Sequence, residues 1–364
     1  MLYRAIGVMS GSSLDGLDIV FAEILENGGK WNYEIKEAVC YPYNTEWTKK
    51  LQQATSLSAL DYQLLHTEYG HYIGSQVNRF ISEKALAYKV GLVASHGHTT
   101  FHVPAKRMTA QLGDGAAIAA ATYLPVVSDL RSLDIAFGGQ GAPIVPIGEK
   151  LLFNDYNYFL NIGGIANISQ KANDIIAYDI CPANRVLNML ANEAGYEYDN
   201  QGNIAVSGML SSALLEKLNA LDYYQQPYPK SLANSFGTDV VYPIIKAAGL
   251  TNADALHTYT QHIAIQIAKN IIALNKNATQ QTQKLMVTGG GAFNVFLIEL
   301  LQEHLAPHHI EVVVPDAMLV QYKEALIMAL MGVLRWREES NVLSSVTGAT
   351  RDSVGGAFWM GQEE

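Results

Sequence analysis

Cysteine is scarce in this chain of 364 residues, which holds only Cys40 and Cys181, far apart in the sequence. It has no Cys-x-x-Cys pair and no Cys/His cluster, which argues against a disulfide framework and a structural zinc site. Basic residues are also few, with 24 Lys and Arg against 34 Asp and Glu. Nucleic-acid binding usually requires a concentrated basic surface. We therefore expect no nucleic-acid partner.

Long apolar runs are absent too. The first residues, Met1–Gly7, lack the basic and apolar regions of a signal peptide. No run of about 18 or more apolar residues indicates a membrane span. We therefore expect a soluble, cytoplasmic protein without a membrane partner. At roughly 100–200 residues per domain, the length predicts two domains.

The first half of the chain opens with a predicted hairpin, residues 3–9 and 17–24, around a polar turn. Residues 57–90 have the apolar spacing of a helix. Residues 90–95 read as a buried strand that ends in a polar loop, 95–102. Further on, the pattern predicts a helix at 116–122, a short strand at 126–128 and a loop at 138–143.

The second half repeats this opening. Residues 158–162 and 165–169 predict a second hairpin around Gly163 and Gly164. Predicted later elements are strands at 175–179 and 284–288 and helices at 255–274 and 323–336. Two halves with the same opening suggest a duplicated α/β unit with a cleft between the halves, where small-molecule sites usually lie.

Two glycine-containing segments are candidate nucleotide-binding loops. Residues 7–18 combine glycines, serines and the carboxylates Asp15 and Asp18. Successive backbone N–H groups in such a turn bind anions, and the carboxylates are suitable Mg2+ ligands. The alternative is an exposed hairpin turn. Residues 287–294 contain three glycines directly after a predicted strand. This pattern allows the close approach of a flat ligand, and it also occurs in an ordinary strand-to-helix turn.

Several polar residues are candidate catalytic or binding groups. Asp179, at the end of a predicted strand, is placed to act as a general base, or to cap a loop. His96, His98 and His102 follow a strand, and the His-x-His spacing fits metal ligation or the alternation of a strand equally well. Sugar hydrogen bonding is favoured over metal ligation. Arg131 and Asp134 are alternatively a simple ion pair.

Nine segments, in this order, resemble the anhydro-N-acetylmuramic acid kinase family and span nearly the whole chain. They are GVMSGSSLDGLD (7–18), SHGHTTFHVP (95–104), QLGDGAAIA (111–119), VVSDLRSLDIAFGGQGAPIVP (126–146), LNIGGIANIS (160–169), DICPAN (179–184), VTGGGAFN (287–294), KEALIMALM (323–331) and NVLSSVTGA (341–349). The family resembles the wider actin/hexokinase-like fold, an α/β, duplicated two-domain fold with an interdomain cleft. On this basis the first domain is residues 1–145 plus about 340–364, and the second is residues 146–339.

The resemblance assigns roles to individual residues, with ATP and Mg2+ as the implied cofactors. Asp179 matches the catalytic aspartate, while the protein ligands of the metal are not identified. The implied nucleotide-binding residues are Gly11, Ser12, Ser13, Leu14, Asp15, Gly16, Leu17, Asp18, Gly163, Gly164, Gly289, Gly290, Gly291 and Asn294. The implied sugar-side residues are His96, His98, Thr99, Arg131, Asp134, Gln140 and Glu324.

The implied reaction couples hydrolysis to phosphoryl transfer. Asp179 takes a proton from water, the water attacks the anomeric carbon of a 1,6-anhydro sugar, and the released bridge oxygen attacks the γ-phosphate of ATP. A glycosidase normally protonates its leaving oxygen. Phosphorylation of that oxygen replaces the general acid here. The products are ADP and a 6-phosphorylated amino sugar of cell-wall recycling, and a homodimer follows by family analogy.

The chain departs from the family at three of the places described here and from the wider fold at a fourth. Ser12 stands for the usual Thr, and His98 for the usual Gln. The usual Asp-Thr-Gly-Pro-Gly-Asn loop is here Asp179–Asn184 with Ile, Cys and Ala inside it. If that loop requires positive φ, Cys181 and Ala183 are unfavourable there. Met9 stands where many ATPases of this fold have Asp.

Two other functions remain open from sequence. One is an ordinary amino-sugar kinase of the same fold, in which Asp179 deprotonates a sugar hydroxyl. The other is a nucleotide-binding switch or sensor without catalysis. A comparison of anhydro and reducing sugars as substrates separates the anhydro-sugar kinase from the ordinary amino-sugar kinase. Nucleotide binding without sugar-dependent turnover identifies the switch or sensor.

Overall fold

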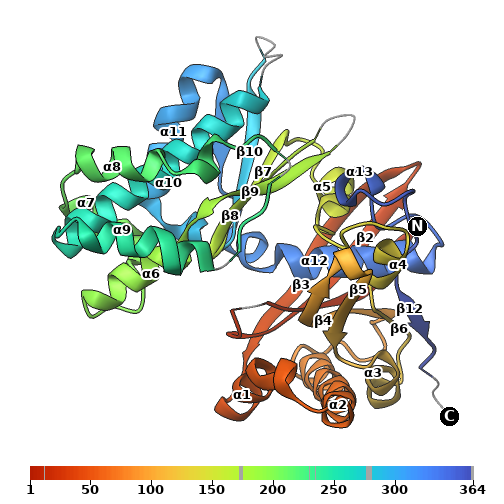
Figure 1. Ribbon diagram of the computed structural model, residues 1–364. Helices are drawn as coiled ribbons and strands as arrows, with labels where there is room; N and C mark the ends of the chain where they lie inside the picture. The colour runs from red at the N-terminus through yellow and green to blue at the C-terminus, as the bar shows by residue number, and fades with distance from the viewer. Residues whose placement is uncertain (12, 172–174, 229, 234, 276–280, 362–364) are drawn as a thin grey trace. The chain divides into compact units, whose positions relative to one another are not determined.

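The computed structural model describes residues 1–11, 13–171, 175–228, 230–233, 235–275 and 281–361. The chain forms two compact units, one of Met1–Asn154 with Tyr322–Glu364 and one of Asp155–Gln321. The boundaries between the two units fall at 154/155 and 321/322. The sequence analysis predicted domain boundaries at 145/146 and about 339/340. Figure 1 shows the chain coloured along its length.

The first unit is built on a mixed sheet with seven strands among the described residues. Its order is β12-β6-β4-β1-β2-β3, and β5 pairs with β4. The opening hairpin predicted from sequence is confirmed: β1 and β2 pair antiparallel, and β4 lies parallel to β1 on its other side. The strands are β1 (Leu2–Ser10), β2 (Gly16–Asn27), β3 (Lys30–Pro42), β4 (Leu92–Val103), β5 (Met108–Leu112), β6 (Val126–Ser128) and β12 (Ala357–Trp359).

Helices cover the first sheet because its central strands are apolar on both faces. Ile6 and Val8 of β1 belong to a buried cluster with Tyr69 and Ile73 of α2. Gly7 lies between Ile6 and Val8 and faces the opposite side of the sheet, where it contacts α12. Successive residues of a strand face opposite sides of the sheet. The unit's helices are α1 (Thr45–Gln53), α2 (Ala59–Glu83), α3 (Gly115–Thr122), α4 (Ser132–Ala136), α5 (Pro146–Leu152), α13 (Ser344–Thr347) and most of α12 (Ala317–Trp336).

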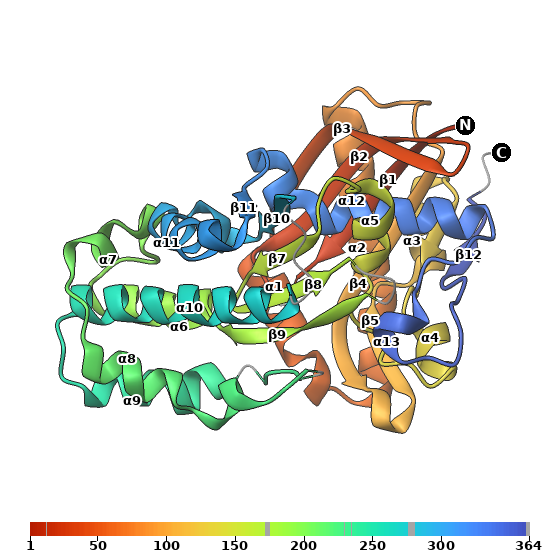
Figure 2. The same cartoon turned by 90° about the horizontal axis from the view of Figure 1, so that it is seen from above.

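Helix α12 is long and apolar enough to cross a membrane by length and composition. However, 72% of its apolar window is buried inside the protein, which is the property of a core helix. A Cβ on Gly7 would lie 1.8 Å from the Ala325 carbonyl oxygen, so α12 packs directly on β1. Figure 2 draws α12 across the strands β1 and β2.

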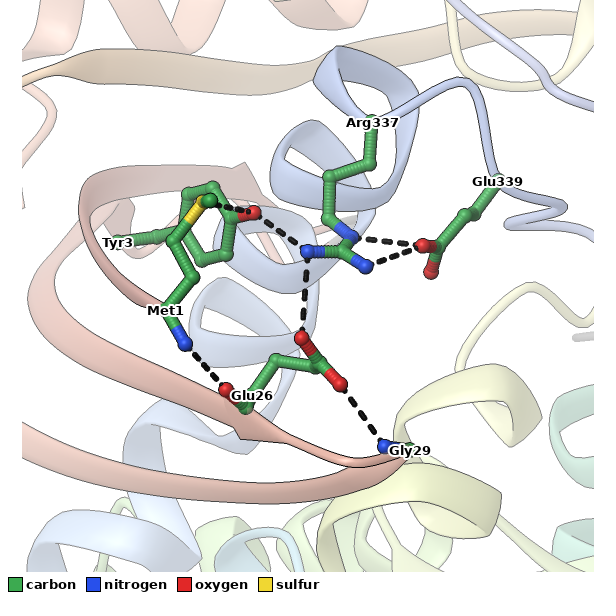
Figure 3. Close-up of polar contacts among 6 residues, drawn as sticks. All are labelled: Met1, Tyr3, Glu26, Gly29, Arg337 and Glu339. Atoms are coloured by element: carbon green, nitrogen blue, oxygen red, sulfur yellow. Dashed lines mark hydrogen bonds and ion pairs between the residues drawn. The ribbon is translucent and has the colours of Figure 1, made fainter.

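A polar cluster ties the far end of α12 to the opening hairpin (Figure 3). The Arg337 guanidinium donates to the Tyr3 hydroxyl at 2.6 Å and contacts Glu26 at 3.4 Å and Glu339 at 2.5 Å. Glu26 also accepts a hydrogen bond from the N–H of Gly29 at 2.8 Å, in the β2–β3 turn. The start of β1, the β2–β3 turn and the segment after α12 are therefore held at one point.

The second unit has a five-stranded mixed sheet among the described residues, in the order β11-β10-β7-β8-β9. The predicted second hairpin is confirmed as the antiparallel pair β7 and β8. Its strands are β7 (Tyr158–Ile162), β8 (Ile165–Gln170), β9 (Ile176–Pro182), β10 (Gln283–Thr288) and β11 (Ile310–Val313). Its helices are α6 (Asn184–Glu193), α7 (Asn203–Ser207), α8 (Ser212–Asn219), α9 (Tyr242–Ala247), α10 (Asn252–Leu274) and α11 (Val295–Leu305).

Helix α10 forms the centre of the second unit's core. The predicted apolar face is confirmed, since Ile263, Ile267 and Ile271 are all fully buried. These residues cluster with Leu160 of β7 and Leu285 of β10. Figure 2 draws α10 beside α6, with which it is in contact. The α/β class predicted for both halves is confirmed.

Two predicted loops are strands instead. Residues 95–102 continue β4, because residues 98–103 pair antiparallel with β5, a strand that the sequence pattern did not reveal. Cys181 and Pro182 continue β9, where they pair with Ala166 and Ile165 of β8. Neither Cys181 nor Ala183 has positive φ, so the loop does not impose the backbone cost that the sequence left open.

Gly7→Ala is expected to destabilise the first unit strongly, because its methyl group would meet backbone atoms of α12. We expect the free energy of unfolding to fall by about 3 kcal/mol or more. Gly91→Ala is the control, since its methyl group would lie no closer than 3.4 Å to another residue. Urea unfolding of both variants tests this packing, and equal midpoints would contradict it.

Candidate active site

The first glycine loop joins β1 to β2 and is shaped by Asp15. The Asp15 carboxylate accepts hydrogen bonds from the Ser13 hydroxyl at 2.8 Å and from the Gly16 N–H at 3.0 Å. Leu14 has φ of 58°, a conformation that residues other than glycine rarely adopt and that marks functional sites. The predicted contribution of Ser12 lies outside the described residues.

Four of the loop's predicted nucleotide-binding residues differ in what they can offer a ligand. Gly11 has no backbone atom in tight contact, since a Cβ there would lie 3.3 Å from the rotatable Ser13 hydroxyl and 3.9 Å from the Ser13 nitrogen. Gly16 is required by packing, because a Cβ would lie 2.5 Å from Cys40 Sγ. Leu17 is fully buried in the core, so only its backbone is available. Asp18 is largely buried, and burial raises its carboxyl pKa to about 6 against the lowering effect of a hydrogen bond with Cys40.

A group of acidic and basic side chains surrounds Asp18 in the first unit. The charges of Asp15 and Glu324 add to the rise in the pKa of Asp18. Glu324 also raises the pKa of Arg131, although burial has the larger effect and lowers it to about 10. The fold therefore brings Asp18, Glu324 and Arg131 into electrostatic range. No group of three His, Cys, Asp or Glu side chains that could hold a metal by itself occurs in the described residues.

Arg131 is held in place by neutral partners. Its Nε donates to His96 Nε2 at 2.8 Å, and another guanidinium nitrogen donates to the Gly141 carbonyl at 2.7 Å. His96 Nδ1 lies 2.9 Å from the Gly97 carbonyl, so this histidine carries its proton on Nδ1. Burial and the charge of Arg131 lower the pKa of His96 to about 3. His96 thus has no free nitrogen for a metal ion or a sugar.

Asp134 binds the loop at residues 138–143 and does not bind Arg131. Its carboxylate is fully buried and accepts from the Gly141 N–H at 2.8 Å and the Thr347 hydroxyl at 2.7 Å. The ion pair between Arg131 and Asp134, one of two interpretations of the sequence, is therefore not formed. Gln140 is exposed and bonds to Thr347 through its backbone N–H at 2.8 Å. Its side chain is available to a ligand.

His98 belongs to a hydrogen-bonded chain behind the first loop. Its Nδ1 lies 3.0 Å from the Ser10 hydroxyl, which accepts from the Tyr43 hydroxyl at 2.7 Å. Tyr43 in turn lies 2.5 Å from the Tyr69 hydroxyl. Thr99, next on β4, is exposed. This chain fixes His98 at the point where β1 enters the first loop.

In the second unit, the Gly163–Gly164 turn is attached to the start of α6. The carbonyls of Gly164 and Gly163 accept the N–H groups of Ala183 and Asn184 at 2.8 and 3.0 Å. Neither glycine has positive φ, and a Cβ on either would come no closer than 3.7 Å to other residues. The protein's own packing therefore does not require glycine here, which suggests that a ligand approaches this backbone.

The second glycine segment, Gly289–Gly291, lies next to this turn. Asn184 connects them, since its side-chain amide donates to the Ile162 carbonyl at 3.0 Å and a Cβ on Gly290 would lie 3.5 Å from it. Gly291 is required by packing, because a Cβ would lie 2.2 Å from Ile162. Asn294 caps α11, with Oδ1 accepting from the Leu297 N–H at 3.1 Å.

Asp179 lies on β9, four residues before the Ala183 N–H that bonds the glycine turn. Its Oδ2 accepts the Leu232 N–H at 2.9 Å, and its own N–H donates to the Lys230 carbonyl at 3.3 Å. No hydrogen bond to Oδ1 is found among the described residues. Burial raises the pKa of Asp179, while the Leu232 hydrogen bond opposes this rise. A partly buried carboxylate with one free oxygen is suited to accept a proton.

The sequence did not single out several residues that shape this site. Asn184 and Arg185 follow Asp179 in the helix start and lie beside the glycine segments. Tyr223 donates to the Asp179 carbonyl at 2.7 Å from a region without a recognisable motif. Only proximity in the fold reveals Tyr223, because it is 44 residues from Asp179 in the sequence.

The chain matches a protein family and named relatives over most of its length. The family model "Anhydro-N-acetylmuramic acid kinase" matches residues 3–361. A protein of that name from Aliivibrio fischeri is 36% identical over 320 residues, covering 83% of this chain and 84% of its own. Another from Sulfurovum sp. is 32% identical over 369 residues, covering 98% and 99%.

Among solved structures, a hexokinase from Schistosoma mansoni with glucose matches at 11% identity and a TM-score of 0.39, covering 90% of this chain and 85% of its own. An activator of 2-hydroxyisocaproyl-CoA dehydratase from Clostridium difficile, with bound ADPNP, matches at 14% and 0.45, covering 92% and 96%. From the family match and the curated relatives, the chain belongs to the anhydro-N-acetylmuramic acid kinase family.

Proposed function

We propose that the chain is an ATP-dependent kinase that opens 1,6-anhydro-N-acetylmuramic acid by hydrolysis and phosphorylates its O6. The products are N-acetylmuramic acid 6-phosphate and ADP. Family membership supports this substrate, and the geometry of Asp179 is the observation that carries the chemistry. Its carboxylate is partly buried, held by Leu232 through one oxygen, with no hydrogen bond to the other in the described residues.

Asp179 acts as the general base. It removes a proton from a water molecule as that water forms a bond to the anomeric carbon of the sugar. The bond from this carbon to the bridging oxygen breaks, and the oxygen takes the γ-phosphoryl group of ATP, with ADP as the leaving group. The proton on Asp179 is then released to solvent. Phosphorylation of the bridging oxygen makes a general acid unnecessary, so one carboxylate suffices.

Backbone groups at the two glycine turns bind the phosphates of ATP in this proposal. Gly11, Gly163 and Gly164 support it, because their packing leaves room at each Cβ position. Gly290, beside Asn184, leaves comparable room for the adenosine. Phosphate binding through N–H groups is compatible with the chain's formal charge of −10.

The acidic side chains of the first unit fit a Mg2+ ion that arrives with ATP. The charges of Asp15 and Glu324 add to the rise in the pKa of Asp18, and a nearby divalent cation would relieve this repulsion. We propose Asp18 and Glu324 as the groups that face the metal, directly or through water. Bound Mg2+ would neutralise charge on the transferring phosphoryl group.

Arg131 provides the positive charge on the sugar side. Its hydrogen-bond partners are neutral, and it forms no ion pair with a carboxylate in the described residues. Its pKa of about 10 keeps it charged at neutral pH. An anionic substrate can use this charge, and the lactyl carboxylate distinguishes a muramic from a glucosamine sugar. His98, Thr99 and Gln140 complete the proposed sugar contacts.

The remaining expectations are part of this proposal. The enzyme works on a small molecule in the cytoplasm, without a nucleic-acid or membrane partner. The burial of α12 supports a soluble protein. A homodimer, the cleft between the halves and the domain boundaries stay predictions.

Asp179→Asn is expected to reduce turnover by about 10²–10⁴-fold, which is the contribution of general-base catalysis. ADP release is measured with ATP, Mg2+ and the anhydro sugar, beside N-acetylmuramic acid and N-acetylglucosamine. Wild-type protein should turn over the anhydro sugar alone, and the variant should still bind nucleotide. Turnover of a reducing sugar alone would indicate an ordinary sugar kinase, and no turnover of any would favour a binding role.

Gly164→Ala is expected to leave thermal stability unchanged but to raise the Kd for ATP roughly tenfold, because displaced phosphates lose charge-assisted hydrogen bonds worth ~1.5 kcal/mol. Gly291→Ala is the contrasting variant, since its methyl group meets Ile162 and should lower the melting temperature. Calorimetric titration and thermal melts separate the two effects. Unchanged ATP affinity in Gly164→Ala would contradict the proposed phosphate turn.

Arg131→Met is expected to raise the KM for 1,6-anhydro-N-acetylmuramic acid about tenfold or more relative to that for 1,6-anhydro-N-acetylglucosamine, which lacks the carboxylate. The reason is the loss of a partly desolvated charge pair. The ratio of the two KM values corrects for any general disturbance of the loop around Gly141. An equal change for both sugars would show that Arg131 does not recognise the carboxylate.

A further inference from the structure

The segment from Tyr223 to Leu232 holds Asp179 at three separate atoms. The Tyr223 hydroxyl donates to the Asp179 carbonyl oxygen at 2.7 Å. The Lys230 carbonyl accepts from the Asp179 N–H at 3.3 Å. The Leu232 N–H donates to Asp179 Oδ2 at 2.9 Å. Residues more than 40 positions away in the sequence therefore bind the N–H group, the carbonyl oxygen and the carboxylate of Asp179.

Tyr223 is itself fixed by packing. Its ring is buried, lies edge-on to Tyr224 with centroids 5.7 Å apart, and is 5.5 Å from the ring of Phe236. The Lys230 ammonium lies 4.7 Å from the ring centroid and 3.4 Å from the Tyr223 carbonyl. The hydroxyl therefore has a defined position, and the lysine links the tyrosine to the same segment that binds the Asp179 N–H.

A second tyrosine fixes the other end of this stretch of β9. The Tyr259 hydroxyl, fully buried on α10, donates to the Pro182 carbonyl at 2.7 Å. Between these two points, Ile180 and Cys181 are fully buried. With its peptide groups held at both ends, the backbone of Asp179 cannot shift without breaking buried hydrogen bonds.

We propose that Tyr223 is a positioning residue for the general base, which it aligns through the Asp179 backbone carbonyl without touching substrate. This inference rests on the proposed function, in which Asp179 activates water. Oδ2 is held by Leu232, so the direction of Oδ1 is set by the backbone of Asp179. A base displaced by about 1 Å loses as much as a hundredfold in rate, and Tyr223 prevents this displacement.

Tyr223→Phe is the direct test, because it removes the hydroxyl and keeps the ring among Tyr224, Phe236 and Lys230. Tyr224→Phe is the matched control. Tyr224 is the adjacent residue and is also buried, but its hydroxyl has no hydrogen-bond partner in the part of the chain that the structure describes. Removal of such a hydroxyl is neutral or slightly stabilising.

We expect kcat with the anhydro sugar to fall roughly tenfold or more in Tyr223→Phe. The Kd for ATP should remain at the wild-type value, because the glycine turns are not altered. Tyr224→Phe should match wild type in both. Thermal melts confirm that both variants are folded, and a merely structural role of Tyr223 would lower stability without a selective loss of kcat.

The pH dependence of kcat/KM gives a second readout. The Leu232 hydrogen bond stabilises the charged carboxylate, so its loosening removes an effect that lowers the pKa of Asp179. The pKa of Asp179 should then rise, and activity should be lost at a higher pH on the acidic side in Tyr223→Phe. The other titratable groups around Asp179 are Tyr178 and Cys181 on β9, Tyr223 itself, and Lys230 with Lys269 beyond it.

Tyr178, Cys181 and Tyr223 stay protonated on the acidic side. Burial raises the pKa of Cys181 and of both tyrosines, and it lowers that of Lys230 from an ordinary value of 10.5. Asp179→Asn serves as the reference variant. If it is inactive and Tyr223→Phe equals Tyr224→Phe in kcat and pH profile, the inference is overturned while the proposed function stands. If Asp179→Asn keeps wild-type turnover, the proposed function fails, and the inference fails with it.

Discussion

The hydrogen bond from the Leu232 N–H to Asp179 Oδ2 determines how the proposed active site works. It occupies one carboxylate oxygen, leaves the other for water and opposes the rise in pKa that burial causes. Tyr223 and Lys230 attach the neighbouring residues to Asp179, and the Leu232 side chain packs against the core of the unit. The strand ends at Pro182, and the next residue, Ala183, donates its N–H to the Gly164 carbonyl, so a short stretch of backbone connects the base to the proposed phosphate turn.

The glycines divide into those that the fold requires and those that it does not. Gly7 and Gly291 have neighbours that would overlap a methyl group, so packing alone explains them. Gly11, Gly163 and Gly164 have no such neighbour and no positive φ. At such a position neither packing nor backbone conformation requires glycine, and glycine costs more conformational entropy on folding than any other residue. Close approach of a ligand to the backbone is the remaining reason for glycine there.

Much of the fold could be predicted from periodicity. The two hairpins and the apolar face of α10 depend on local patterns, and the structure has them. By contrast, β5 and the extension of β4 to Val103 depend on pairing with each other, and β5 is short while the extension of β4 is mostly polar, so no local pattern indicated them. Asp179 followed from its place at a strand end, although β9 continues through Pro182.

The supporting residues were beyond sequence reasoning for a physical reason. Tyr223 acts through a hydroxyl on a backbone carbonyl, a contact that no residue spacing announces. Asp134 and His96 looked like ligand-binding groups by type, but each has its polar atoms engaged by the protein. A polar residue type near a site does not reveal whether its atoms face the ligand or the scaffold. The family resemblance named the loops, and the structure separates their supporting residues from the available ones.

The stereochemistry of the product tests the central claim, that water activated by Asp179 displaces the bridging oxygen directly. In a 1,6-anhydro-β sugar the bridging oxygen occupies the β face of the anomeric carbon, so a single displacement enters from the α face and inverts the centre. Proton NMR of the first turnovers, recorded before the anomers equilibrate, should show the α anomer of the 6-phosphate. An initial β anomer, or an equilibrium mixture from the start, would contradict direct attack by water.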